Sequence, residues 1–382
     1  MSSFRHFITN SLILGSYMNN TSALGTPHAF TFLNLSLCQN LYRFVSTDEI
    51  ISRLIGRKMA TIAGDFNFTD EEAKVCAEKL KDAMDGFGTN EADIVEVLVT
   101  HNNEQRQAIA ETYRVAYGKP LIEDLISELT GDLEEVVCAL MTKPREYDAK
   151  MLHDAICGAG TDEYTLIGIL CTRTNEEIEQ IKEAYTTLYE ADLVEDIQGD
   201  TSGYFGRMLY SLAQAGRQDC DSDDDLADEE AQKLIDAGVG QLGTDECDFN
   251  SVLCLSSYRQ LKKVFEKYQE KREGKSIEED IDSEMGSDLK DGYLAIVKVT
   301  KDKEGYFAER LHKAMKGWGT DDSELIRLIC SHAETDLLWI AERYKEMFEG
   351  ADLFENVKDE CGGYYKSVLL SLIAGRYVSK DE

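Results

Sequence analysis

Acidic residues and glycines are the residues of this chain whose spacing could support metal chemistry. The segment DCDSDDDLADEE matches positions one, three, five, seven and twelve of an EF-hand loop at Asp219, Asp221, Asp223, Asp225 and Glu230. An EF-hand needs Gly at the sixth position, where the backbone turns sharply, and this chain has Asp224 there. The sequence therefore favours an acidic linker that captures calcium weakly at most, and a calcium site must be sought elsewhere.

A second pattern occurs four times and is built on glycine. The four copies read MDGFGTNEADI, ICGAGTDEYTL, VGQLGTDECDF and MKGWGTDDSEL. Their second glycines are spaced 72, 83 and 76 residues apart, at Gly88, Gly160, Gly243 and Gly319. Glycine lets a loop bend so that several backbone carbonyl groups converge on one point. Such a loop supplies the oxygen ligands that calcium prefers.

An acidic residue follows each loop at a nearly constant distance and could complete the set of ligands. Three of these acids lie 42 residues after the first glycine of their loop, and the third copy has its acid 41 residues after Gly243. The four acids are Glu128, Asp200, Glu284 and Asp359. In the fourth copy the segment KDECGG leaves Glu360 as an alternative to Asp359. A role as ordinary helix caps is the other interpretation of these acids.

Amphipathic helices are expected on both sides of every loop. In residues 70–84, Ala73, Cys76, Ala77, Leu80 and Met84 recur at spacings of three and four, which is the period of a helix. Thr69 and the acids after it predict a capped helix start, and only three prolines interrupt the chain. The loop threonines are expected to cap the second helix of each copy, at Thr89, Thr161, Thr244 and Thr320. The sequence thus predicts an all-α protein of four repeats, each of about 70–75 residues.

These loops, their distant acids and stretches such as LISELTGDLEEVVCALM and DIQGDTSGYFGRMLYSL resemble the annexin family from about residue 66 to 378. The resemblance implies four repeats of five helices, coiled into a slightly curved disc. Calcium would lie in the loops of the convex face and bridge protein oxygens to phospholipid phosphates. The expected boundaries are an N-terminal extension at 1–65, repeats at 66–140, 141–217, 228–302 and 303–378, and an acidic linker at 218–227.

The resemblance also assigns ligands to each site by position. The first and second sites would use Met84, Gly86, Gly88 and Glu128, and Ile156, Gly158, Gly160 and Asp200. The third and fourth would use Gly238, Gln241, Gly243 and Glu284, and Met315, Gly317, Gly319 and Asp359. Gln241 replaces a glycine, which is tolerable because its carbonyl group is the ligand. The family's arginine after the second helix occurs only as Arg173, which puts the inter-helix salt bridges in doubt.

The net charge of −33 restricts the partners of this chain. Residues 1–58 carry about +3, so the remainder carries −36. Nucleic acid is a poor partner, because binding it requires Lys and Arg against the phosphates. Anionic lipid of the phosphatidylserine type would also be repelled unless a divalent cation lies between, so membrane binding should depend on calcium. The apolar loop tips Phe87, Leu242 and Trp318 could then enter the membrane interface, or fold back onto their own repeats.

Enzymatic activity is not expected. The six histidines are isolated, and the chain has no H-E-x-x-H, G-x-S-x-G or P-loop motif. The rival hypothesis is a calcium-independent helical scaffold that acts through protein–protein contacts. A homodimer or a protein partner on the face opposite the calcium loops would combine the two functions.

The location and the N-terminal segment follow from composition. Ten scattered cysteines without a C-x-x-C motif predict free, mostly buried thiols in a reducing compartment. We therefore expect a cytoplasmic protein that binds membranes peripherally. Exposure at the cell surface, reached without a signal peptide, is the second possibility. The N-terminal extension is interpreted as disordered, with Met59 as an alternative start, while a transit peptide is the other interpretation.

Overall fold

The computed structural model describes residues 60–62, 64, 67–86, 88–158, 160–238, 245–317 and 319–382. Most of the N-terminal extension, the loop tips Phe87, Leu242 and Trp318, and the third-site residues Gln241 and Gly243 lie outside these residues. Residues 56–382 form one compact unit. Within the described part of the chain, no helix has both the length and the apolarity that a membrane span requires.

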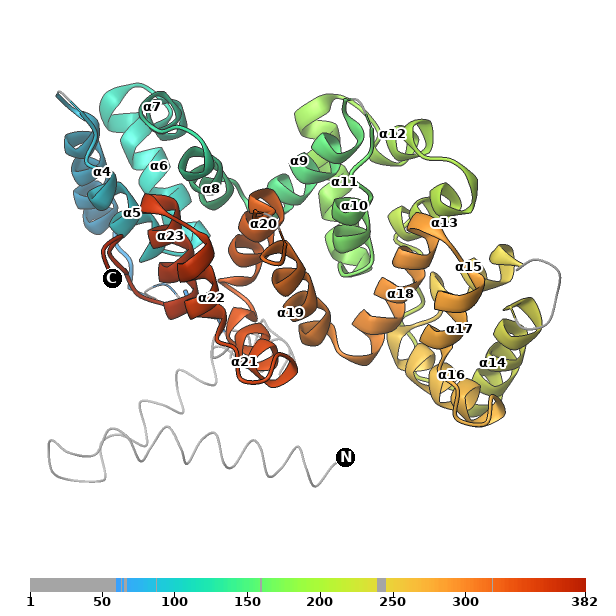
Figure 1. Cartoon of the computed structure of the whole chain (residues 1–382). Helices are drawn as coiled ribbons and strands as arrows, with labels where there is room; N and C mark the ends of the chain where they lie inside the picture. Colours follow the sequence, from blue (N-terminus) through green and yellow to red (C-terminus); the bar gives the residue numbers. More distant parts are fainter. Residues whose placement is uncertain are drawn as a thin grey trace, which may run out of the picture. The chain divides into compact units, whose positions relative to one another are not determined.

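The described residues form twenty α-helices and no strand, five helices to a repeat (Figure 1). The first repeat comprises α4 (Asp70–Met84), α5 (Glu91–Val99), α6 (Asn103–Tyr117), α7 (Leu121–Glu128) and α8 (Asp132–Met141). The second comprises α9 (Pro144–Ile156), α10 (Glu163–Leu170), α11 (Asn175–Tyr189), α12 (Leu193–Asp200) and α13 (Gly203–Ala213). The third comprises α14 (Asp224–Gly238), α15 (Glu246–Leu253), α16 (Tyr258–Lys271), α17 (Ile277–Glu284) and α18 (Ser287–Lys301). The fourth comprises α19 (Lys303–Ala314), α20 (Asp322–His332), α21 (Leu337–Met347), α22 (Leu353–Glu360) and α23 (Gly363–Ala374).

Helix starts follow local side-chain capping. The Thr69 hydroxyl oxygen accepts a hydrogen bond from the Glu72 amide, and the Glu72 carboxylate accepts one from the Thr69 amide, so the predicted start of α4 is confirmed as a capping box. The prediction that the loop threonines cap the second helices is wrong. The caps are the residues one position later, Asn90, Asp162, Asp245 and Asp321. Their side chains reach the backbone amides of the first turn, which leaves the threonine hydroxyl groups available for other partners.

Each repeat is held together by the same helix pairs. The first helix packs on the third, and the fourth packs on the fifth. The second helix is apolar on most sides: Leu166, Ile167, Ile169 and Leu170 of α10 are all buried. A short helix that is apolar on most sides must lie inside the protein, as α5 and α10 do. Helices α15 and α20 also bury most of their apolar side chains.

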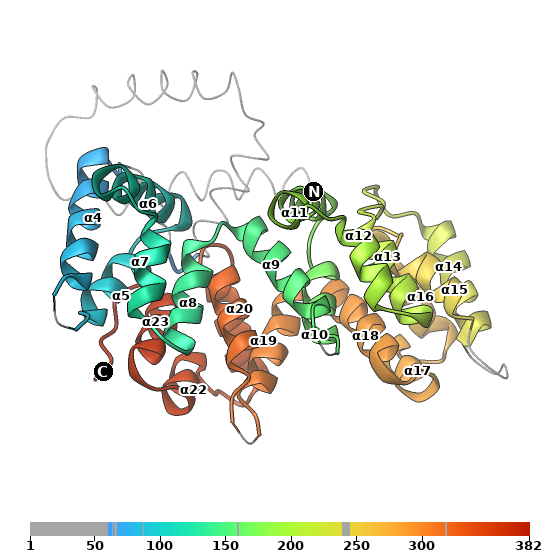
Figure 2. The same cartoon turned by 90° about the horizontal axis from the view of Figure 1, so that it is seen from above.

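The repeats pack in two pairs, the first with the fourth and the second with the third. Helices α5 and α8 of the first repeat contact α23 and α20 of the fourth, and α13 of the second contacts α15 and α18 of the third (Figures 1 and 2). At the first junction the Arg106 guanidinium lies 2.6 Å from the Glu334 carboxylate. At the second the Tyr258 hydroxyl donates to the Cys171 carbonyl oxygen at 2.7 Å. The first and last repeats therefore stabilise each other.

Arg173, the one copy of the family's arginine after a second helix, forms an inter-helix salt bridge in the second repeat. Its guanidinium donates two hydrogen bonds of 2.9 Å to Asp148, which is 1 % exposed. Although burial opposes ionisation, Arg173 and Arg145 lower the pKa of the Asp148 carboxyl. This bridge joins α9 to the turn that precedes α11.

All nine cysteines within the described residues are free thiols, as predicted. The expectation that most are buried is wrong. Of the nine, only Cys171 and Cys254 are buried, while Cys157, Cys220 and Cys247 are exposed.

Candidate calcium sites

A single backbone hydrogen bond closes all four glycine loops. The amide of the residue after the loop threonine donates to the carbonyl oxygen of an alanine near the end of the preceding helix, at 2.8 Å in every copy. The pairs are Asn90 to Ala83, Asp162 to Ala155, Asp245 to Ala237 and Asp321 to Ala314. The closed segment is one residue longer in the third copy than in the other three. Each of Met84, Ile156, Gly238 and Met315 follows the alanine and begins its loop.

The loop glycines adopt a backbone conformation that other residues rarely reach. In the three loops where both glycines are described, φ lies between 87° and 132°, at Gly86, Gly88, Gly158, Gly160, Gly317 and Gly319. A Cβ atom added to any of the six would meet no other atom within 4 Å. Glycine is therefore required here by the chain conformation and not by close packing, and open space lies beside the loop backbone.

The distant acids of the first two repeats lie against these loops. The Thr89 hydroxyl donates to Glu128 at 2.5 Å, and the Thr161 hydroxyl donates to Asp200 at 2.6 Å. These contacts join residues 39 positions apart in the chain. The threonines, which sequence analysis assigned to helix capping, are the residues that bind the acid to the loop. The recurrence of G-T before each second helix was the available signal.

The helix register in the fourth repeat favours Glu360 over Asp359 as the acid. Glu128, Asp200 and Glu284 are each the last residue of an eight-residue helix, and the last residue of the eight-residue helix α22 is Glu360. A residue with positive φ stands three positions after each of these helix ends, at Gly131, Gly203, Ser287 and Gly363. Glu360 also lines a hollow of about 440 Å³ together with Thr320, the loop threonine of its repeat. Asp359 has neither position.

Further acids surround the fourth site. The pKa of Asp322 is raised by burial and by the neighbouring carboxylates Asp132 and Asp321. A hydrogen bond from Tyr365 offsets only part of this rise. Asp132 and Asp322 line the same hollow as Glu360. Such a concentration of negative charge would be relieved by a bound cation.

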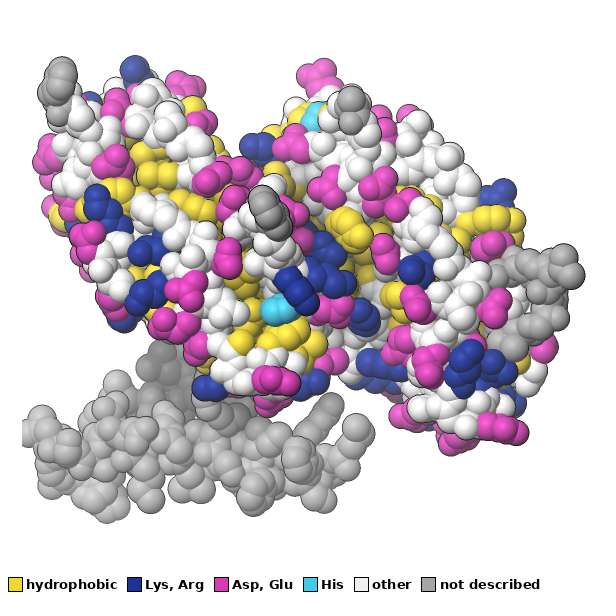
Figure 3. Space-filling view, in the orientation of Figure 1, with side chains coloured by type: hydrophobic (Ala, Val, Ile, Leu, Met, Phe, Trp, Pro, Cys, Tyr) yellow, Lys and Arg dark blue, Asp and Glu magenta, His cyan; other side chains and the backbone are white. Residues whose placement is uncertain are grey.

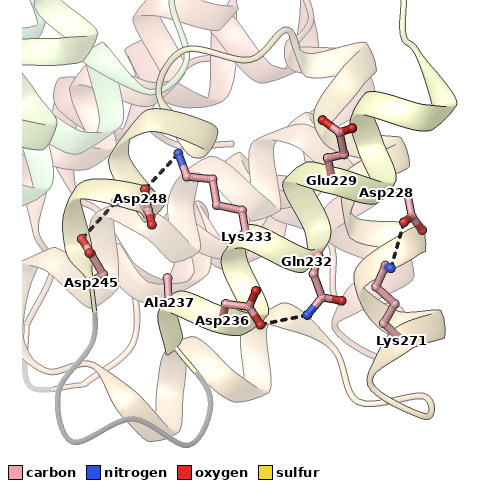
Figure 4. Close-up of a pocket in the computed structure, with 9 residues that line it drawn as sticks. All are labelled: Asp228, Glu229, Gln232, Lys233, Asp236, Ala237, Asp245, Asp248 and Lys271. Carbon is pink, nitrogen blue, oxygen red and sulfur yellow. Dashed lines mark hydrogen bonds and ion pairs between the residues drawn. The ribbon is translucent and has the colours of Figure 1, made fainter.

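The third site is only partly described. Figure 4 shows a pocket at the base of its loop, where Ala237 and Asp245 lie on either side of the segment outside the described residues. Lys233 bonds to Asp248 at 2.9 Å and Lys271 to Asp228 at 2.9 Å, so cations of the chain itself neutralise part of the acidic lining. Gly238 ends α14, and Glu284 ends α17 in the register of the other acids.

The acidic segment 219–230 does not form an EF-hand loop. Helix α14 begins at Asp224, so Asp225 and Glu230 are helical residues, and the ligand-bearing turn is not formed. Glu230 accepts hydrogen bonds from Ser256 and Gln260. Three aspartates of the segment instead pair with cations of α16: Asp221 with Arg259, Asp224 with Lys263 and Asp228 with Lys271.

The described donor set fits calcium better than a softer metal. Backbone carbonyl groups and one carboxylate per loop are hard oxygen ligands, which calcium prefers. Among the residues that the structure describes, no three His, Cys, Asp or Glu side chains gather as a metal site would require. A cation at these loops would therefore depend on peptide oxygens for most of its coordination.

Comparison with known proteins decides the family. The annexin family model matches residues 76–140, 147–212, 229–296 and 306–372. This chain belongs to the annexin family. Human annexin A13 is 46 % identical over 298 residues, which cover 78 % of this chain and 94 % of that protein.

Solved annexin structures share the fold. Annexin III superposes with a TM-score of 0.80 at 38 % identity, covering 83 % of this annexin and 97 % of that chain. A calcium-bound annexin (Sm)1 superposes with a TM-score of 0.72 at 31 % identity, covering 84 % and 94 %. The predicted all-α fold of four five-helix repeats is confirmed. Membership also accords with the expectation of a non-enzymatic protein of a family that binds calcium and phospholipid.

Proposed function

We propose that this annexin binds anionic phospholipid surfaces through calcium held at four loops, one in each repeat. The carbonyl groups of the loop residues and one carboxylate from the end of the fourth helix would hold each ion. The proposed carboxylates are Glu128, Asp200, Glu284 and Glu360, where Glu360 replaces Asp359. The hydrogen bonds from Thr89 to Glu128 and from Thr161 to Asp200 carry the proposal, because they join loop and acid across 39 residues.

The negative charge of the chain makes its binding to anionic lipid depend on calcium. Acidic side chains are spread over the face shown in Figure 3, and the whole chain carries −33. Calcium, when bound, supplies positive charge at the loops and accepts phosphate oxygens as further ligands. The glycines leave one side of the loop backbone uncovered, so a phosphate could approach without a clash with side chains. Without the ion, the acids would repel an anionic membrane.

The loop tips would add an apolar contact. We infer that Phe87, Leu242 and Trp318 enter the lipid interface once calcium has brought the loops to the membrane. A role in membrane organisation, repair or trafficking follows from such reversible attachment. The calcium-bound form of annexin (Sm)1 supports the choice of ion, because that chain shares the fold.

Co-sedimentation with phosphatidylserine vesicles tests the proposal. The parent should pellet with the vesicles in calcium and stay in the supernatant in chelator. A quadruple variant, Glu128→Ala, Asp200→Ala, Glu284→Ala and Glu360→Ala, should stay in the supernatant in both. The matched control removes four exposed acids from the same helices, Glu123, Glu195, Asp282 and Glu355, and should pellet in calcium like the parent.

The rival function, a calcium-independent scaffold that acts through protein contacts, makes the opposite prediction. Equal pelleting in calcium and in chelator, with no effect of the quadruple substitution, would refute calcium-gated binding. A homodimer or a partner on the opposite face would be added to calcium-dependent binding and would leave this result unchanged.

A further inference from the structure

Every repeat contains a fully buried tyrosine on its third helix. These are Tyr113 on α6, Tyr185 on α11, Tyr268 on α16 and Tyr344 on α21, each 0 % exposed. Each hydroxyl forms a hydrogen bond with a side chain of the fourth helix. The distances are 2.8 Å to Asp124, 2.7 Å to Asp196, 2.7 Å to Asp280 and 2.7 Å to Asn356. A buried hydroxyl that is hydrogen-bonded to an Asp or Asn side chain of the fourth helix in all four repeats points to a shared task.

The partner lies one helical turn before the proposed calcium carboxylate. Asp124, Asp196, Asp280 and Asn356 are four residues ahead of Glu128, Asp200, Glu284 and Glu360. Residues four apart lie on the same face of a helix, about 6 Å from each other. The tyrosine therefore holds the helix on the face, and close to the end, from which the carboxylate projects.

The fourth helices are short and bury few apolar side chains, three on α12 (Leu193, Val194 and Ile197) and two on each of α7 and α22. Each has only eight residues, or about two turns. Helix α7 buries only Leu121 and Leu125, and α22 buries only Leu353 and Val357. Two or three apolar contacts restrict the rotation of so short a helix about its own axis only weakly. A hydrogen bond from a buried side chain restricts it more. The third helices, in contrast, pack along the first helices of their repeats.

We propose that these tyrosine–acid pairs are positioning residues that set the carboxylate of each calcium site. The inference rests on the proposed function and extends it to residues that do not touch the ion. Loss of the hydroxyl would let the fourth helix rotate and would weaken calcium binding without unfolding the repeat. Second-layer partners of metal ligands act in this way, and their removal typically lowers metal affinity by about 10–100-fold.

The fourth repeat shows that the bond can be kept with a neutral partner. A carboxylate can only accept, so the Tyr185 hydroxyl donates to Asp196, whereas the Asn356 amide donates to the Tyr344 oxygen. His153 and His312 each lie 3.1 Å from the same tyrosine oxygens and complete the hydrogen bonding. Hydrogen bonding and not charge is thus the common feature, which predicts that Asn can replace Asp196.

The second site offers the sharpest test. The full chain carries Glu128→Gln, Glu284→Gln and Glu360→Gln, so that one acid remains, and calcium alone is titrated by calorimetry. Tyr185→Phe should weaken calcium binding about 10-fold, while the melting temperature of the calcium-free protein stays within about 2 °C of the background. Tyr189→Phe is the matched control, because Tyr189 lies one turn further along α11 and stacks on His153; it should leave the affinity unchanged.

Two variants of the partner keep the inference falsifiable if Tyr185→Phe also lowers the melting temperature. Asp196→Asn should bind calcium within about twofold of the background, and Asp196→Ala should lose about 10-fold. Unchanged affinity in Tyr185→Phe, or equal losses in Asp196→Asn and Asp196→Ala, would overturn the positioning role. Asp200→Ala separates this result from failure of the proposed function: if calcium binding survives that change, the site itself is wrongly assigned.

Discussion

At the scale of residues, one extra position in the chain decides which carboxylate belongs to the fourth site. The distance from the cap of the second helix to the buried tyrosine is 23 residues in all four repeats. From that tyrosine to its partner on the fourth helix, the distance is 11 residues in the first two repeats and 12 in the last two. The additional residue lies in the turn between the third and fourth helices. Counting from the loop glycine therefore reaches Asp359, while the helix register reaches Glu360.

Substitution of each acid separates these two assignments. Glu360→Ala should weaken the fourth site by at least about 10-fold, because a neutral carbonyl cage without its carboxylate binds calcium poorly. Asp359→Ala removes the same charge from the neighbouring position and should change the affinity less than twofold. Calcium titration in a background with the other three acids replaced measures both. The reverse order of effects would restore Asp359.

A second residue-scale prediction concerns Asp280 and pH. Although burial opposes ionisation, hydrogen bonds from Arg272, Lys275 and Tyr268 lower the pKa of Asp280 to about 2. A folded pKa below the ordinary value of 3.8 means that folding favours the ionised form. Its stabilising effect should be complete above about pH 4 and should disappear as the pH falls toward 2. Urea unfolding should show Asp280→Asn less stable than the parent at pH 7, with a difference that narrows below pH 4; a constant difference would contradict this.

At the scale of elements, the acidic segment between the second and third repeats forms ion pairs with α16 and is not a calcium loop. Helix α16 and the turn after it carry many lysines and arginines in a chain with an excess of acid. Asp221, Asp224 and Asp228 each lie within 3.1 Å of one of these cations. Exposed ion pairs of this kind are individually weak, and salt weakens them further. The segment therefore fixes the start of α14 against α16 electrostatically.

The salt dependence of the melting temperature tests the role of these ion pairs. The double variant Asp221→Ala and Asp224→Ala should lower the melting temperature by about 1–4 °C at low ionic strength. The effect should vanish at 1 M salt, where the screening length falls to about 3 Å. Asp219→Ala with Asp225→Ala is the charge-matched control, since one residue lies in the linker and the other in the first turn of α14. A loss of stability that is equal for both variants would show that net charge and not pairing matters.

At the scale of the whole molecule, the contact between the first and fourth repeats closes the chain on itself. Arg106 is 2 % exposed and donates to the Leu140 and Leu98 carbonyl oxygens as well as to Glu334. Thr61 and Ile62, which precede the first repeat, donate their amides to the Ala333 carbonyl oxygen in the fourth. Both contacts join segments more than 200 positions apart.

Glu334→Ala should therefore destabilise the protein strongly. Removal of one partner leaves a buried guanidinium without its counter-charge, which costs roughly 3–5 kcal/mol. The loss of stability should lie at the lower end of this range, because the Glu334 side chain is 27 % exposed. Urea unfolding measures the change, with Glu111→Ala as the control, since its pair with Arg114 is exposed and its loss should change the stability much less. Equal effects of the two substitutions would show that the junction does not depend on this pair.

The sequence by itself determined the repeats, their helices and the glycines of the loops. These features depend on local rules: a helical period of apolar residues, caps at helix starts, and φ values that only glycine adopts readily. For the same reason, the third loop could be identified as one residue longer from the sequence alone. The annexin family followed from the recurrence of these local patterns.

Only the tertiary structure decided which residues meet across the chain. The assignment of the loop threonines to caps failed because Asn90, Asp162 and their equivalents compete for the same amides, and the hydroxyls found carboxylates 39 residues away. The segment 219–230 has the spacing of an EF-hand loop, but its second half is helical and its aspartates pair with cations of α16. Spacing along a chain fixes local geometry, but packing between helices fixes which distant side chains share a site.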